Sequence, residues 1–126
     1  MNTMCRRSLI LAAIVTAAVA IPASAHHSHG NYKMQEFTAL KGTVKEIHWL
    51  TPHSWIYLEV KDAKAEAVLW ALEGASVGEL RRRGWTADSI KVGDTISVRC
   101  HVLQDGSPGC LLGYVTVAGG EEKLFD

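Results

Sequence analysis

One change of hydrophobic period constrains the fold of this chain more than any other feature. Short segments with strand-like alternation precede and follow residues 76–84, and only that stretch has the helical pattern. Ser76 and Glu79 fit a capping box, in which Ser76 is the N-cap and the Glu79 side chain reaches back to it. Gly84 is well suited to end the helix. The sequence therefore predicts a β-rich domain with one short helix.

Five strands are expected around this helix. They cover residues 40–49, 55–61, 67–73, 95–103 and 110–118. The first strand carries a phase slip near Lys45 and Glu46 that indicates a bulge. Three strands, one helix and two strands is the order of the oligonucleotide/oligosaccharide-binding (OB) fold. We therefore predict a mainly β protein, a small five-stranded antiparallel OB-like barrel with one short helix between strands three and four. A small open sandwich is the alternative.

The first 25 residues have the three parts of a secretory signal peptide. Arg6 and Arg7 make a basic start, and residues 9–21 form an apolar run that is too short for a comfortable membrane span. Residues 23–25, Ala-Ser-Ala, are the small residues that a signal peptidase requires. We expect cleavage after Ala25 and a periplasmic or secreted protein with no stable membrane anchor after processing. An uncleaved anchor is the alternative.

Cleavage would leave one domain of 101 residues, enough for a modest core. We expect a polar, histidine-rich arm without regular structure at residues 26–39, an OB-like domain at residues 40–118 and a polar tail at residues 119–126. Loss of the two leader arginines takes the formal net charge from 0 to −2 with neutral histidines. Such a balance lacks the basic footprint of a nucleic-acid-binding protein, so we expect no nucleic acid partner.

Three histidines stand at the start of the expected mature chain: His26, His27 and His29. The amine and the imidazole of His26 can bind one metal ion together, and His27 can chelate it through the intervening amide. Nitrogen-rich planar sites suit Cu(II), which outcompetes most divalent ions, so a copper ion is expected ahead of zinc. The amine and the imidazole must both be neutral to bind the metal ion, so the affinity for the metal should fall at acidic pH.

His48 and His53 form a second group, one on each side of residues 49–52. If those residues form a hairpin loop, the two histidines face each other with Cβ atoms about 4.5–5.5 Å apart. The arm could then bring His26 beside His53, aided by His27 or His48, to enclose one copper ion. The alternatives are an incidental metal-binding tail, a backbone hydrogen bond for His53 and solvent exposure for His48.

Cys100 and Cys110 flank a strong turn signal at residues 104–109. Thiols tend to pair in an oxidising compartment, although alternation places these two cysteines in opposite phase. A bulge would reconcile the phases. The sequence therefore leaves two alternatives: the two cysteines form a disulfide, or they remain as two partly buried free thiols. Alternation sends His101 to the other face from Cys100, which argues against a Cys-Cys-His metal site.

Aromatic residues offer a second kind of function. Trp55 and Tyr57 share the strand face opposite the apolar residues of their strand, and Trp49 precedes the adjoining turn. Amphipathic rings of this kind could dock a periplasmic partner protein or a glycan. Trp70 and Trp85 are expected in the core. The chain has no Gly-x-Ser-x-Gly nucleophile elbow and no glycine-rich phosphate loop, so we expect that it is not an enzyme.

Short motifs spread along the mature chain carry a family resemblance. They are His26-His27-Ser28, Gly42-Thr43-Val44, the stretch 49–57 with Pro52-His53-Ser54-Trp55, Glu73-Gly74, Arg82-Arg83-Gly84-Trp85 and Gly93-Asp94. Together they resemble a family of short exported bacterial proteins of unknown function. Thr51 stands where the family usually has Asn, which changes the chemistry of the turn. The resemblance implies export and a small β-rich domain, and no activity is established for the family.

Two functions are therefore expected as alternatives. The first is an exported protein that binds or delivers a transition metal, copper favoured, through His26, His27, His29, His53 and His48. The second is a non-catalytic module that docks a partner protein or a glycan on its barrel face through Trp55, Tyr57 and Trp49. A block on the amine of His26 separates them, because only the first needs that amine.

Overall fold

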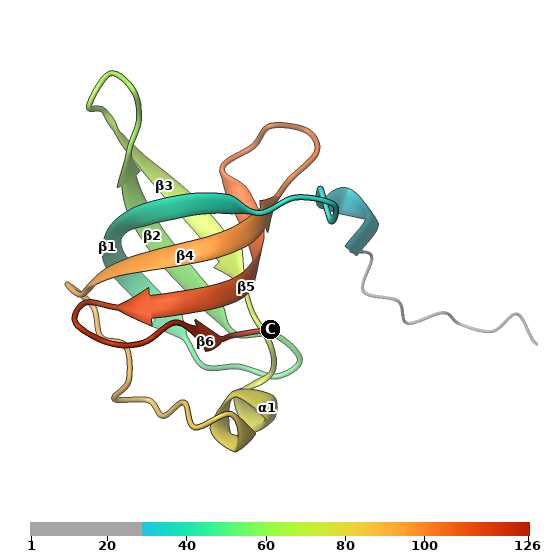
Figure 1. Cartoon of the computed structure of the whole chain (residues 1–126), viewed down its shortest axis with the longest axis vertical. Coiled ribbons are helices and arrows are strands. Elements are labelled where there is room, and N and C mark those ends of the chain that lie inside the picture. Colours follow the sequence, from blue (N-terminus) through green and yellow to red (C-terminus); the bar gives the residue numbers. More distant parts are fainter. Residues whose placement is uncertain (1–28) are drawn as a thin grey trace, which may run out of the picture.

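The structure, a computed structural model, describes residues 29–126 and shows a small closed barrel (Figure 1). Its elements are η1 (His29–Asn31), β1 (Thr38–His48), β2 (Trp55–Lys61), β3 (Ala67–Glu73), α1 (Val77–Arg82), β4 (Thr95–Val102), β5 (Gly109–Val117) and β6 (Lys123–Leu124). The OB-like fold with one short helix between the third and fourth strands is confirmed. The predicted signal peptide and residues 26–28 of the predicted arm lie outside the described residues.

The barrel closes through one parallel pair, which corrects the expectation of a purely antiparallel barrel. Neighbours in the order β3-β2-β1-β4-β5 are antiparallel, and β3 pairs with β5 in parallel. Strand direction reverses at each antiparallel pair, so the first and last of five strands point the same way. A barrel with an odd number of alternating strands can therefore close only through a parallel pair.

Two register shifts bend the sheet. Between Val44 and Glu46 the pairing of β1 with β2 shifts, where the sequence predicts a bulge. The pairing of β4 with β5 shifts between Arg99 and Cys100. This second shift reconciles the opposite phases of the two strands, and a disulfide joins Cys100 and Cys110 with Cα atoms 5.7 Å apart.

The helix α1 lies below one end of the barrel (Figure 1). The hydroxyl of Ser76 accepts a hydrogen bond from the backbone N–H of Glu79, as expected of the N-cap. Gly84 follows the helix with φ of 84°, a left-handed conformation that suits glycine. The carboxylate of Glu79 lies 3.9 Å from Arg82, which corrects the expectation that it reaches back to Ser76.

Residues 119–126, expected as a polar tail, pack onto the closed barrel. They add β6 to β5 and bury Phe125 fully. The Phe125 ring packs against Trp85 and Trp49 at centroid distances of 5.0 and 6.0 Å. Nε1 of Trp85 donates a hydrogen bond to the carbonyl of Leu124 at 2.7 Å. Burial of a phenylalanine side chain contributes about 1.5–3 kcal/mol, which explains why this largely polar segment is held in place.

The core fills the inside of the barrel. Most of its fully buried side chains come from the strands and from α1, and they include Val44, Ile56, Leu58, Leu72, Leu80, Ile96, Leu112 and Val115. Trp85 lies in this core as predicted, whereas Trp70 packs against it and stays half-buried. Within residues 29–126, no helix is long and apolar enough to cross a membrane.

Candidate functional site

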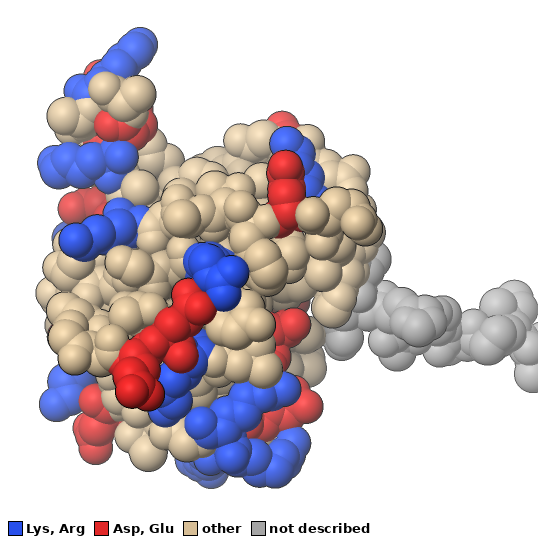
Figure 2. Space-filling view, viewed as in Figure 1, with Lys and Arg blue, Asp and Glu red and all other residues tan. Residues whose placement is uncertain are grey.

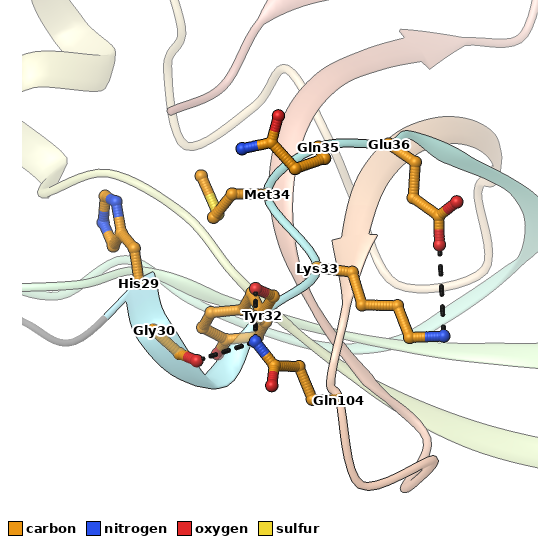
Figure 3. Close-up of a pocket in the computed structure, with 8 residues that line it drawn as sticks. All are labelled: His29, Gly30, Tyr32, Lys33, Met34, Gln35, Glu36 and Gln104. Atoms are coloured by element: carbon orange, nitrogen blue, oxygen red, sulfur yellow. Dashed lines mark hydrogen bonds and ion pairs between the residues drawn. The ribbon is translucent and has the colours of Figure 1, made fainter.

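The described part of the arm, residues 29–37, packs beside the loop between β4 and β5 (Figure 1). The backbone N–H of Lys33 donates to the carbonyl of Val102 at 2.9 Å. From the loop, Nε2 of Gln104 donates to the carbonyl of Gly30 at 2.9 Å (Figure 3). The expectation of an arm without regular structure is therefore corrected for these residues, which are hydrogen-bonded to the barrel.

His101, on β4, also holds the arm. Its Nδ1 lies 2.7 Å from the carbonyl oxygen of Glu36 and 3.2 Å from that of Lys33. Carbonyl oxygens only accept hydrogen bonds, so this nitrogen carries the ring proton. The Phe37 ring packs on the imidazole with centroids 4.2 Å apart. The outward side of β4 therefore anchors the arm through an imidazole and an aromatic contact.

Tyr32, Glu73 and His53 form a part-buried polar network between the arm and the barrel. The hydroxyl of Tyr32 donates to Oε2 of Glu73 at 2.6 Å. Nδ1 of His53 lies 3.3 Å from Oε1 of the same carboxylate and 3.3 Å from the carbonyl of Gly74. The His53 and Glu73 side chains are only 22% and 15% exposed, so their interaction is partly shielded from water. One carboxylate thus joins the arm to His53.

The surroundings fix the protonation of two groups in this network. Burial raises the pKa of the Tyr32 hydroxyl, and its hydrogen bond to Glu73 raises it further. Tyr32 therefore stays a proton donor at neutral pH. Nδ1 of His53 lies near two oxygen acceptors, the Glu73 carboxylate and the Gly74 carbonyl, so this nitrogen is placed to donate the ring proton to them. Histidines that bind metals are commonly oriented in this way, by a carboxylate or carbonyl on the other ring nitrogen.

The structure does not bring His48 and His53 together as predicted. Trp55, not His53, is the partner of His48 in the register of β1 and β2. His48 instead places Nε2 3.0 Å from the Glu46 carboxylate and its ring edge-on to Tyr57 at 5.6 Å. Pairing of β2 begins at Trp55, so His53 belongs to the preceding loop and turns toward the end of β3.

The other predicted metal ligands are distributed differently. His29 is exposed at the start of η1, where it lines a surface pocket of about 630 Å³ together with Met34 (Figure 3). His26 and His27 lie outside the described residues. Among residues 29–126, no group of three or more His, Cys, Asp or Glu side chains is arranged to hold a metal ion.

The predicted aromatic face is adjacent to the network. Trp55 lies opposite Glu73 in the register of β2 and β3, and Trp55 and Tyr57 are both half-buried. Trp49 packs against Phe125 instead of joining this face. Sequence reasoning missed Tyr32 and Glu73 as partners of His53. The one sequence signal for Glu73 was the Glu73-Gly74 motif of the family resemblance.

Comparison with known proteins gives one match. A family model covers residues 13–112, well over half of the chain, and its description is a family of unknown function. Searches of curated proteins and of solved structures give no significant match. The matched segment includes Tyr32, His53 and Glu73.

Proposed function

The chain belongs to DUF6152, a family of unknown function, and we propose that it is an exported, non-catalytic protein that binds or delivers a transition metal, copper favoured. The proposed ligands are His26, His27, His29 and His53. The observation that supports this most directly is the network in which Glu73 contacts both Tyr32 of the arm and His53 of the barrel. The network connects the segment that follows the expected amino terminus to an oriented imidazole.

The length of the arm permits its histidines to reach His53. His27 precedes Tyr32 by five residues, and an extended chain spans at most about 3.3–3.6 Å per residue, so roughly 18 Å is the largest separation of their Cα atoms. Because Glu73 contacts both the Tyr32 hydroxyl and His53, the described part of the arm lies close to His53. An anchored arm also loses less conformational freedom on binding than a free tail, which favours tighter binding than a peptide achieves.

The donor set favours Cu(II). An amino-terminal amine and several imidazoles make a nitrogen-rich site, and copper stands above the other common divalent metals in affinity for such sites. With its proton on Nδ1, His53 would bind through Nε2, and the Glu73 carboxylate would hold the ring in that orientation. Metal affinity should fall as the amine, with a reference pKa of about 7.7–8.0, and the imidazoles, at about 6.5, become protonated.

A competitive Cu(II) titration at pH 7 tests the proposal. The protein should be processed to begin at His26 and compared with a copy that has one extra alanine in front. We expect the processed protein to bind Cu(II) well above the affinity of a free His-His-Ser-His peptide, and the extended copy to lose that excess. Equal, peptide-like affinities in both forms would contradict the proposal.

The same titration tests the role of the barrel. His53→Ala should weaken Cu(II) binding by at least about 10–100-fold, because loss of a group that merely orients a metal ligand already costs that much. His48→Ala is the matched control, because His48 is exposed and contacts Glu46 instead of the network. If His53→Ala and His48→Ala bound Cu(II) with equal affinity, His53 would not be a ligand, and the histidines of the arm alone would bind the metal.

A non-catalytic binding module for a partner protein or a glycan is the second candidate. It is favoured by Trp55 and Tyr57, which are half-buried on the outer face of the barrel next to Glu73. Oligosaccharide titrations followed by tryptophan fluorescence test it. Binding that Trp55→Ala abolishes, and that an added alanine before His26 leaves unchanged, would favour the module over the metal protein.

A further inference from the structure

The two ends of the barrel differ. At one end, α1 and the buried ring of Phe125 cover the core. At the other end, Leu40, Val60, Val68 and Trp70 are only half-buried. The β2–β3 hairpin and the loop between β4 and β5 rise on either side of this second end, away from α1 (Figure 1). The second end is therefore open.

The half-buried side chains at the open end face the inside of the barrel. Trp70 is the register partner of Leu58, which is fully buried, and Val60 and Val68 are partners two positions farther along the same strands. Side chains two positions apart on a strand share a face. A cavity of about 340 Å³ lies among them. Its other lining residues are Leu40, Lys61, Asp62, Gly106 and Pro108.

The cavity has the size and chemistry of a small-molecule site. Such sites typically measure about 300–1,000 Å³, have mostly apolar walls with a few polar groups, and occur at the mouths of β-barrels. Here the walls are aliphatic side chains and the indole of Trp70. A volume near the lower limit restricts the occupant to a short apolar body.

The rim of the cavity supplies one available positive charge. Asp62 is engaged in the hairpin turn, where its Oδ1 accepts from the backbone N–H groups of Lys64 and Glu66 at 2.8 and 2.9 Å. Lys61 forms no ion pair with any other residue of the described range 29–126. Figure 2 shows charged side chains on this hairpin and a largely uncharged surface beside it. An apolar hollow next to one ammonium group suits an amphipathic anion.

We propose that the open end of the barrel binds a medium-chain fatty acid. The acyl chain lies among Leu40, Val68 and Trp70, and the carboxylate pairs with the Lys61 ammonium. This site shares no residue with the network of Tyr32, Glu73 and His53, so it is independent of metal binding.

Calorimetric titration of the full mature protein with decanoate tests the proposal. We expect saturable binding at one site, with much weaker binding of butyrate, which lacks the apolar chain, and of decylamine, which carries the opposite charge. Lys61→Glu should weaken decanoate binding by roughly tenfold or more, because it replaces attraction by repulsion. Lys91→Glu, at another exposed lysine, is the matched control and should leave the affinity unchanged.

A second variant tests the cavity without changing charge. Val68→Phe adds volume at the open end, so it should abolish decanoate binding while urea unfolding shows that the barrel remains folded. The proposal is overturned if decanoate does not bind, if decylamine binds equally well, or if the folded Val68→Phe protein binds like the original.

Discussion

Tyr32 donates its hydroxyl hydrogen to Oε2 of Glu73 over 2.6 Å, although the two residues are 41 positions apart in the sequence. Tyr32 belongs to the arm and Glu73 ends β3. A hydrogen bond to a charged group contributes about 1.5–3 kcal/mol, more than a bond between neutral groups. This bond therefore attaches the arm to the barrel, and through the same carboxylate it connects the arm to His53.

Removal of this hydroxyl should destabilise the protein. Tyr32→Phe keeps the ring and deletes the donor, so we expect the free energy of unfolding to fall by about 1.5–3 kcal/mol in urea titrations. Tyr57→Phe is the matched control, because the Tyr57 hydroxyl has no hydrogen-bond partner within residues 29–126. Equal losses in the two variants would show that the bond to Glu73 has no special role.

The raised pKa of Tyr32 predicts a decline of stability at alkaline pH. Below the ordinary tyrosine pKa of about 10, folded and unfolded chains both keep this proton, and the contribution is complete. As the pH rises above that value, only the unfolded chain releases the proton, so the free energy of unfolding should fall. Urea unfolding at several pH values above about 9 should show a smaller decline in Tyr32→Phe than in the original protein. If the free energy of unfolding declined equally in Tyr32→Phe and in the original protein, Tyr32 would not be the group responsible.

The disulfide between Cys100 and Cys110, ten residues apart, should stabilise the β4–β5 hairpin. A cross-link that closes a loop of this size contributes about 2–3 kcal/mol, chiefly by restricting the unfolded chain. The double variant Cys100→Ala, Cys110→Ala should lose about that amount in urea titrations. Reductant should lower the free energy of unfolding of the original protein and leave that of the double variant unchanged. If reductant also destabilised the double variant, its effect would not come from the disulfide.

Phe125 should matter more than its position at the end of the chain suggests. It is fully buried between Trp49 and Trp85. Phe125→Ala should therefore lower the free energy of unfolding by about 3–5 kcal/mol, as expected for a large cavity. Its neighbour Leu124 is 41% exposed, so Leu124→Ala should have a much smaller effect. Comparable losses would indicate that the segment contributes through its backbone pairing instead.

Local pattern was sufficient for much of the fold. The strands expected at residues 55–61 and 67–73 are β2 and β3 with the same bounds, and Ser76 caps α1 as expected. Alternation and capping involve neighbours along the chain, so they can be read before any tertiary contact is known. The parallel pair of β3 and β5 was missed, although it follows from the odd number of strands once the barrel closes.

The candidate site was only partly predictable. His53 was predicted as a site residue because histidine is a common metal ligand. Tyr32 and Glu73 were not predicted, since a single side-chain hydrogen bond leaves no periodic pattern in a sequence. The expected pairing of His48 with His53 failed because the strand pairing starts at Trp55. A loop residue takes its direction from the backbone around it, and that direction depends on the whole barrel.

The sequence by itself determined the order of the strands, the capped helix and the histidines at positions 26, 27 and 29, because these depend on composition and on short-range periodicity. Only the tertiary structure decided that the arm docks, that Phe125 enters the core and that His53 meets Glu73. Those contacts join segments separated by tens of residues, and they exist only when closure of the barrel brings the segments together.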